Sequence, residues 1–340
     1  MRPWFERDDW EALADEKGLD RRERARVDAY RRDGFLLFED DRILDGIDAD
    51  GIWERLRPRF AGGDGVRVQD AWETEESVRA IALQPQIIAT LRMLYGREPI
   101  PFQTLNFLTG TEQRTHSDVI HFSSLPAGFM CGVWVALEDI TLRQGPLHYF
   151  RGSQRLPELD YEDLGIAPVR GVPMWSNPNT LAAYQAYEEK IAALAAESGF
   201  AREDVAIRRG SWLIWSANLL HGGTPRDDRT LTRRSQVTHY YFENAIPYTP
   251  MFSRRSDDAF FVRALRSVRD GKLLPPPTLD GARVLFPRVK DEPHLRSIRP
   301  AAALPPYARW SLGGGALPQP GFSVLRNRAG SIAQRLGIRP

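Results

Sequence analysis

The chain has 340 residues, 42% of them hydrophobic and 27% charged, which is ordinary for a globular protein with a sizeable core. Its 46 Lys and Arg residues balance 45 Asp and Glu residues, so a small-molecule partner is favoured over nucleic acid or a membrane surface. Cys131 is the single cysteine, which excludes an internal disulfide. With no secretory signal and no long apolar run, we expect a cytoplasmic protein.

The first hundred residues predict a layer of helices. In "DRRERARVDAYRRDG", Val27 and Tyr30 share one side and Gly34 ends the helix. The apolar run "FLLFED" then predicts a short strand. Further helices are expected over about 47–56 and over "PQIIATLRMLYG", which Gly96 ends.

From Phe102 onward the sequence predicts mainly β structure. Short runs rich in β-branched and aromatic residues are separated by turn residues, and at least five such runs favour a sandwich or barrel. They are "FQTLNFL", "FMCGVWVALEDI", "PLHYF", "GSWLIWS" and "SQVTHYYF". An Ala-rich helix over about 180–199 interrupts them, and we expect it to pack on the outside. After residue 243, frequent Pro and Gly predict a wrapping segment without a second core.

The stretch "RTHSDVIHF" contains a candidate half of a metal site. On a strand, His116 and Asp118 point to the same face while Ser117 points away, so the first two can hold one ion together. An HxD triplet is common by chance. It therefore needs a third ligand elsewhere in the chain.

The stretch "GSWLIWSANLLHGGTP" supplies that third ligand. An apolar strand leads to His221, and the two glycines after it can let the backbone approach a ligand closely. Two imidazoles and one carboxylate leave coordination positions open on one side of an octahedral ion, as in non-haem Fe(II) oxygenases. A structural zinc site would instead close its four positions, usually with cysteines.

Two adjacent arginines could anchor a cosubstrate for such an iron site. An oxygenase of this kind needs an electron source, and 2-oxoglutarate serves if a cation holds its far carboxylate. Arg233 and Arg234 open the strand "SQVTHYYF", and a guanidinium pairs with a carboxylate through two parallel hydrogen bonds. Because strand side chains alternate, only one of the two can point inward.

Four motifs in order, "QRTHSDVIHF", "QGPLHYFRGSQ", "GSWLIWSANLLHGG" and "TRRSQVTHYYF", resemble the core of the phytanoyl-CoA dioxygenase family. The resemblance, with "YRRDGFLLFED" as the opening strand, covers about residues 28–243. It implies a mainly β protein with a double-stranded β-helix (jelly roll, cupin-like) core that uses Fe(II), 2-oxoglutarate and O2. We expect a helical extension over 1–27, the oxygenase domain over 28–243, with its helical layer and inserted helix, and the wrapping segment over 244–340.

The resemblance also implies roles for individual residues. They are His116, Asp118 and His221 as the metal ligands, Arg233 as the anchor of 2-oxoglutarate, Trp134 as an aromatic residue beside the cosubstrate, and Thr224 and Asn106 as its hydrogen-bond partners. Arg233 is preferred to Arg234 because it stands six residues before His239, as in the family. Halogenating relatives replace the carboxylate ligand with a small residue, so Asp118 favours hydroxylation.

The sequence therefore predicts an oxygenase that hydroxylates an aliphatic carbon of a small or medium-sized biosynthetic metabolite and releases succinate and CO2. Two alternatives stay open: a cupin-like metal-binding protein without the chemistry, and a metal-dependent hydrolase or isomerase on the same fold. Strict dependence of activity on 2-oxoglutarate separates the first function from both.

The remaining histidines and two residues after the arginine strand have plain structural interpretations. His121 falls on the opposite face of the strand from Asp118 unless the chain turns. We expect His148 and His239 in the core and His294 in a solvated loop. Tyr248 and Met251 are expected in packing or at the substrate mouth.

Overall fold

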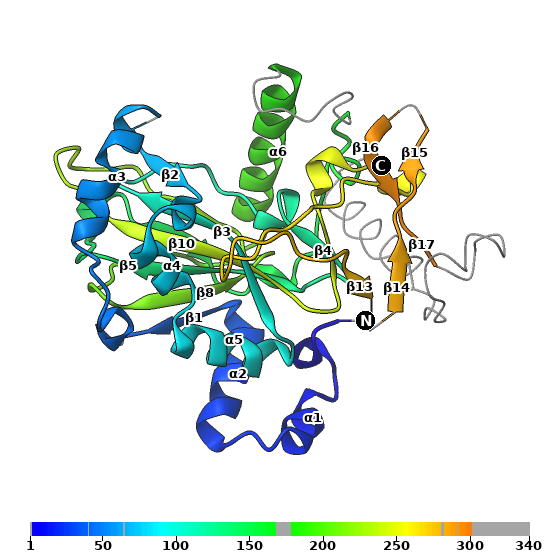
Figure 1. The fold of residues 1–340 in the computed structure, drawn as a ribbon, viewed down its shortest axis with the longest axis horizontal. Coiled ribbons are helices and arrows are strands. Elements are labelled where there is room, and N and C mark those ends of the chain that lie inside the picture. Colours follow the sequence, from blue (N-terminus) through cyan, green and yellow to red (C-terminus); the bar gives the residue numbers. More distant parts are fainter. Residues whose placement is uncertain are drawn as a thin grey trace.

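Two antiparallel sheets form a double-stranded β-helix in the computed structural model, which describes residues 2–39, 41–63, 65–167, 178–279, 282–290 and 292–300 (Figure 1). The strands of the large sheet, in spatial order, are β1 (Phe35–Phe38), β8 (Trp212–Ser216), β5 (Met130–Ala136), β10 (Ser235–Phe242), β3 (Pro99–Phe107) and β2 (Arg67–Gln69). Those of the small sheet are β7 (Arg202–Asp204), β6 (Leu147–Phe150) and β9 (His221–Gly223). The mainly β class predicted from the sequence is confirmed.

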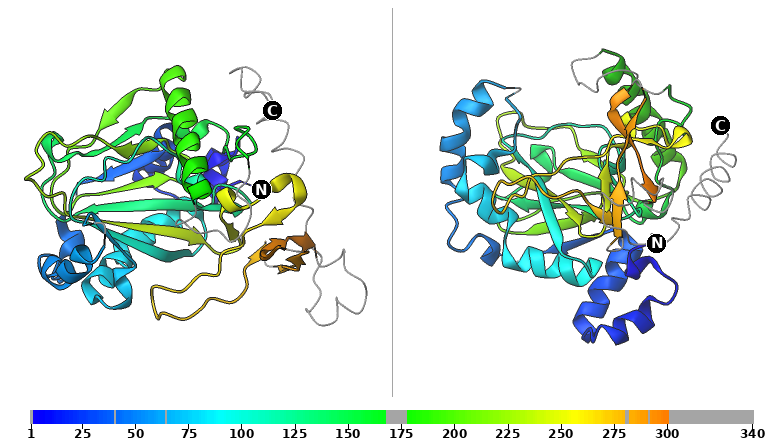
Figure 2. Two further views of the ribbon diagram at one scale, coloured as in Figure 1. Left: turned by 90° about the horizontal axis from the view of Figure 1, so that it is seen from above. Right: turned by 45° about the vertical axis from the view of Figure 1, so that its right-hand side comes forward.

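Helices cover the outer face of the large sheet, as Figures 1 and 2 show. They are α1 (Trp10–Glu16), α2 (Arg21–Asp33), α3 (Gly51–Ala61), α4 (Glu76–Ala82) and α5 (Pro85–Tyr95). Their apolar sides share one core with the outward-facing residues of the sheet, including Val133, Val135 and Ile214. Burial of the apolar faces of the helices against that of the sheet is the main stabilising contact of the N-terminal half.

The helix ends follow local capping chemistry. Asp20 Oδ1 accepts a hydrogen bond from Glu23 N, and Glu23 Oε2 accepts one from Asp20 N; this capping box starts α2. Gly34, at φ 83°, ends α2 in the left-handed conformation. The helix predicted over 47–56 instead spans Gly51–Ala61, because Asp48 Oδ1 accepts the Gly51 N–H at 2.9 Å and so favours a later start.

Strand side chains alternate strictly between the two cores. On β5, Val133 and Val135 face the helices, while Trp134 faces the small sheet; on β8, Ile214 and Leu213 divide in the same way. Both faces of these strands are therefore buried. This explains why "GVWVA" and "WLIW" are continuously apolar in the sequence.

The described part of the C-terminal segment runs back over the domain. Strand β11 (Ile246–Tyr248) pairs with β4 (Ser123–Leu125), and Val268 N donates to Pro101 O beside the large sheet. Short strands follow: β12 (Ala259–Phe260), β13 (Thr278–Leu279), β14 (Ala282–Leu285), β15 (Arg288–Val289), β16 (Glu292–Ser297) and β17 (Arg299–Pro300). Residues 301–340 lie outside the described residues, and the three domain boundaries stay a prediction. None of the described helices combines the length and apolar character that a membrane crossing requires.

Gly132 makes room for an indole ring that the site needs. It lies opposite Trp215 in the β5–β8 pairing, and a Cβ at position 132 would stand 2.1 Å from the Trp215 ring. We expect Gly132→Ala to lower the free energy of unfolding by roughly 1–3 kcal/mol, as other overpacked cores show. Urea unfolding measures the effect. The control Gly62→Ala meets only Pro58 O at 3.4 Å, and an equal loss in both variants would contradict the steric argument.

Candidate active site

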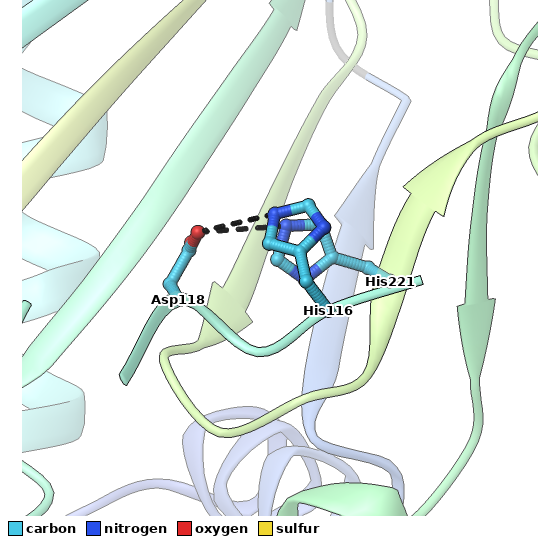
Figure 3. Close-up of side chains that lie close together, drawn as sticks. All are labelled: His116, Asp118 and His221. Atoms are coloured by element: carbon cyan, nitrogen blue, oxygen red, sulfur yellow. Dashed lines mark ion pairs between the residues drawn. The ribbon is translucent and has the colours of Figure 1, made fainter. Parts of the chain in front are cut away.

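Two histidines from distant parts of the chain are held side by side by a backbone bridge. His116 N donates to His221 O at 2.9 Å, and His221 N donates to His116 O at 3.0 Å. Directly paired residues of an antiparallel bridge project to the same face, and the two imidazole centroids are 4.5 Å apart. Figure 3 shows both rings turned toward Asp118.

The carboxylate of Asp118 completes the group. Its Oδ1 lies 3.7 Å from Nε2 of His116 and 3.7 Å from Nε2 of His221, and the three ligand atoms lie within 4.8 Å of one another. All three side chains are buried. The HxD pair and the third ligand predicted from the sequence therefore come together in one place.

Backbone carbonyls fix which imidazole nitrogen faces the group. His116 Nδ1 lies 2.9 Å from Arg114 O, and His221 Nδ1 lies 2.9 Å from Leu219 O. A carbonyl can only accept, so each Nδ1 carries the proton and each Nε2 keeps its lone pair. This tautomer is the one in which a histidine binds a metal through Nε2.

The charge states also suit a cation. Burial opposes ionisation of Asp118, but the nearby imidazoles of His221 and His116 outweigh it and hold the carboxyl pKa well below its usual value. Burial lowers the pKa of His221 to about 4. Burial alone would also lower the pKa of His116, but the adjacent Asp118 carboxylate raises it above the usual value. An ionised carboxylate and a neutral imidazole both offer lone pairs to a metal ion. A bound cation would in turn keep the carboxylate ionised and the imidazole neutral.

Trp215 orients the second oxygen of the carboxylate. Its indole Nε1 donates to Asp118 Oδ2 at 2.8 Å, and both groups are buried. Ser117, between the two ligands in sequence, donates instead to Ala217 O at 3.1 Å. The carboxylate is thus fixed from behind, with Oδ1 left toward the histidines.

Arg233 lies inward and Arg234 outward, as the alternation on the strand requires. The Arg233 side chain is buried between the rings of Phe107 and Trp134, 5.7 and 5.9 Å from their centroids. Its Nη1 donates to Gly145 O at 2.9 Å, while its Nε is without a partner among the described residues. Burial lowers the pKa of Arg233 to about 10, so the guanidinium still carries its charge at neutral pH.

A cavity of about 730 Å³ joins these groups. The three ligands line it, together with Arg233 and Trp134. A small diacid that chelates a metal at one end needs a buried, unpaired cation at the other. The residues present therefore fit both an iron ion and 2-oxoglutarate.

Comparison with known proteins identifies the family. The family model described as "Phytanoyl-CoA dioxygenase (PhyH)" matches residues 60–234, more than half of the chain. The chain belongs to the phytanoyl-CoA dioxygenase family. It is accordingly a 2-oxoglutarate-dependent enzyme of the oxygenase type, with Fe(II) and 2-oxoglutarate as cofactors. Among curated proteins, a search by sequence finds no match.

Solved structures share the fold at low sequence identity. One is the epimerase SnoN in complex with Fe3+, alpha ketoglutarate and nogalamycin RO, with 20% identity, a TM-score of 0.50, and coverage of 75% of this chain and 96% of that one. Another is the alpha ketoglutarate dependent carbocyclase SnoK from nogalamycin biosynthesis, with 16% identity, a TM-score of 0.50, and coverage of 68% and 87%. Both likenesses support the double-stranded β-helix.

Two residues carried over from the phytanoyl-CoA dioxygenase family do not reach the cavity. Asn106 faces the helical layer, where its Nδ2 donates to Gln236 Oε1 at 3.2 Å; its neighbours Leu105 and Phe107 line the cavity instead. Thr224 lies beyond β9, and its hydroxyl bonds with Asp204 and, at 3.0 Å, with Arg202. Neither residue is among those that line the cavity, so their placement does not support the predicted hydrogen bonds to the cosubstrate.

The glycines after His221 let two segments of the chain lie close together, a role that the sequence did not predict. A Cβ at Gly222 would lie 2.8 Å from Gln113 O, and one at Gly223 would lie 2.9 Å from Glu112 N. Their lack of a side chain lets the segment that carries His116 lie directly against β9. Both glycines also line the cavity, so the predicted close approach of their backbone to a ligand stays a prediction.

The other histidines divide between the cavity and the scaffold. His121 reaches the cavity because the chain turns in a 3-10 helix at Asp118–Ile120, and its Nε2 lies 3.2 Å from the Tyr184 hydroxyl. His239, expected in the core, also lines the cavity, with Nε2 3.8 Å from Asp118 Oδ2. His148 is structural as expected, 3.0 Å from Thr115 Oγ1.

Three further predictions on single residues have clear outcomes. His294 lies in strand β16, half-buried, and not in a solvated loop. Met251 lines the active-site cavity. Tyr248 lines a separate cavity of about 840 Å³, because its strand pairs with β4 and turns the ring away.

The inserted helix α6 (Pro178–Glu197) lies beside the sheets (Figure 2), and one of its sides also lines the cavity, which the sequence did not predict. Leu181, Tyr184, Gln185 and Glu188 recur at helical spacing and line the cavity together. Further along, the helix packs through Ile191 and Leu194. The sequence showed one apolar stripe, and nothing in the stripe distinguished cavity from core.

Trp215 gives a direct test of the metal centre. Trp215→Phe keeps an aromatic side chain but removes the indole N–H that donates to Asp118. We expect it to weaken Fe(II) binding about 10-fold, as loss of such a supporting hydrogen bond does elsewhere. Anaerobic equilibrium dialysis measures the dissociation constant. Trp212→Phe is the matched control, because that indole Nε1 has no partner among the described residues and faces the helices. Equal affinities of the two variants would show that the Asp118 contact has no role in binding.

Proposed function

We propose that the protein hydroxylates an aliphatic carbon of a small or medium-sized metabolite, using Fe(II), 2-oxoglutarate and O2. The observation that carries the proposal is one cavity lined by two imidazoles, one carboxylate and the buried guanidinium of Arg233, which forms no ion pair with a described residue. Such a ligand set leaves neighbouring coordination positions open for a chelating cosubstrate and O2. A cupin-like binding protein would have no use for the buried cation.

The iron would be held by Nε2 of His116, Nε2 of His221 and Oδ1 of Asp118. Their 3.7 Å separations suit one ion, because two metal–ligand bonds of about 2 Å can span them. When bound, iron and 2-oxoglutarate supply the oxidising chemistry, in which O2 decarboxylates the keto acid to succinate and CO2 and oxygenates the substrate. The protein's own contribution is to fix these donors and exclude water.

Arg233 would bind the far carboxylate of 2-oxoglutarate, with Trp134 beside it. Its guanidinium retains Nε and part of its donor fork for a ligand, and the surrounding rings of Phe107 and Trp134 exclude water that would weaken the pairing. Arg234 instead contacts Glu138 and Trp53 on the helical side. This placement supports Arg233 as the anchor.

The two arginines provide the decisive comparison. We expect Arg233→Gln to weaken 2-oxoglutarate binding by roughly 10- to 100-fold, since a desolvated charge-assisted pair is lost, while Arg234→Gln has little effect. The measurement is an anaerobic titration of the Fe(II) protein with 2-oxoglutarate, followed by the visible charge-transfer band of the chelated keto acid. Iron binding without such a band would instead favour the hydrolase or binding-protein alternatives.

The reaction outcome is tested by the mass of the product. With 18O2, a cell extract as substrate source and saturating 2-oxoglutarate, we expect a product that gains one labelled oxygen atom and is absent with Asp118→Ala. Succinate should form in step with it. A product of unchanged mass would indicate epimerisation, and one that has lost two hydrogens would indicate ring closure or desaturation. Either result would contradict hydroxylation while leaving the dependence on 2-oxoglutarate intact.

A further inference from the structure

We infer that Arg263 binds an anionic group of the substrate, a carboxylate or a phosphate, at the end of the cavity opposite Arg233. The inference rests on the proposed function, because it takes the cavity to be the substrate site. It narrows the substrate class to organic anions. Arg263 comes from the C-terminal segment, outside the matched family region of residues 60–234.

Arg263 has the contacts of a cation prepared for a ligand. It lines the cavity, and its guanidinium lies over Phe122 and Phe102, 4.8 and 5.6 Å from the ring centroids. Nη1 donates to Thr249 Oγ1 at 3.0 Å, and Nε is buried without a partner among the described residues. The aromatic rings fix the plane of the guanidinium and leave donors for an incoming acid.

The carboxylates of the cavity are occupied elsewhere. The two that line it are Asp118 and Glu188. Asp118 faces the histidines and Trp215. Glu188 lies on α6, where it interacts with His116, Tyr184 and Arg114. No described carboxylate forms an ion pair with Arg263, so a buried donor group and its charge remain uncompensated.

Arg263 lies close enough to the metal centre to position a substrate there. Its guanidinium contacts Phe122, whose ring centroid is 5.0 Å from that of His239, and His239 Nε2 is 3.8 Å from Asp118 Oδ2. Three successive contacts thus connect Arg263 to the carboxylate ligand. A molecule held at Arg263 would extend its carbon skeleton toward the iron.

2-Oxoglutarate cannot be the ligand of both arginines. Arg233 lies six residues before His239 on the inward face of the β10 segment, a separation of about 20 Å along a strand, and Arg263 packs at the His239 end. A cosubstrate that spans from the iron to Arg233 leaves the Arg263 end for another molecule. Met251 and Phe252, which follow the Arg263 partner Thr249 closely in the chain, also line the cavity, which suits an apolar body attached to the anionic group.

The test compares matched anionic and neutral probes. Hexanoate, hexyl phosphate and the neutral hexanamide share one alkyl chain, and their dissociation constants are measured by calorimetry on the full chain with Fe(II) and 2-oxoglutarate saturating under argon. The variants are Arg263→Gln, Arg263→Lys and Thr249→Val. The control is Arg266→Gln, which removes an exposed guanidinium of the same segment that pairs with Glu73.

We expect at least one anion to bind the wild-type protein about 10-fold or more tightly than hexanamide, as a charge-assisted pair implies. The preference should vanish in Arg263→Gln, fall in Arg263→Lys and Thr249→Val, and persist in Arg266→Gln. The anion that shows it distinguishes a carboxylate from a phosphate substrate. No preference in the wild-type protein, or one unchanged in Arg263→Gln, would overturn the inference.

The same experiment separates this inference from the proposed function. If the wild-type protein fails to bind 2-oxoglutarate, the proposed function fails, and the probes are then compared on the iron-free protein with Arg233→Gln, which removes the other cavity cation. A preference that still depends on Arg263 would retain an anion site in a protein of another activity. If Arg263→Gln does not fold, Thr249→Val decides, because it removes only the hydroxyl that orients the guanidinium.

Discussion

The buried carboxylate of Asp118 is the constraint on which the site depends. A carboxylate removed from water is strongly destabilised unless hydrogen bonds and opposite charges compensate it. Here Trp215 donates one hydrogen bond, and three imidazoles lie within 3.8 Å. The imidazoles keep the carboxylate ionised despite its burial, and a bound divalent cation would stabilise the same charge further. The fold therefore keeps a charged group in the interior that a metal ion stabilises.

The position of that carboxylate follows from strand pairing more than from side-chain contacts. The bridge between His116 and His221 fixes the segment 114–118 against β9, and small residues at 222 and 223 let the two backbones approach. On the opposite side, Gly132 leaves space for the Trp215 ring. Close packing at these three glycines thus helps to hold the metal centre between the two sheets.

Sequence periodicity predicts the parts of the site that lie on strands. The alternation of two predicts that His116 and Asp118 share a face and that one of the two arginines points inward. Both outcomes hold, although His116 lies in an isolated bridge, Asp118 begins a 3-10 helix and Arg233 lies just before β10. The same rule, applied to β3, would have placed Asn106 away from the cavity, since Phe107 beside it faces inward. The family resemblance assigned a role to Asn106 by its position in the motif alone, without regard to the face of the strand on which the side chain lies.

Contacts between segments that lie far apart in the chain could not be predicted from the sequence. His121 depends on a single 3-10 turn, and the cavity face of α6 looks like any apolar helical stripe. Arg263 lies in a segment predicted only to wrap, and its role depends on Phe122 and Thr249, which are far from one another in the chain. No local pattern marks such a residue, because its environment exists only after folding.

Different parts of the chain supply the metal site and the rest of the cavity wall. Strand β9 and the segments bonded to the sheets supply the metal ligands and Arg233, and paired strands hold this geometry rigidly. The inserted helix and the C-terminal segment supply Tyr184, Glu188 and Arg263, which border the remaining space. Substitutions in these two segments can therefore change what the cavity accepts without moving the iron ligands. Selectivity for the substrate should reside in α6 and in residues after 243, while the oxidative chemistry resides in the sheets.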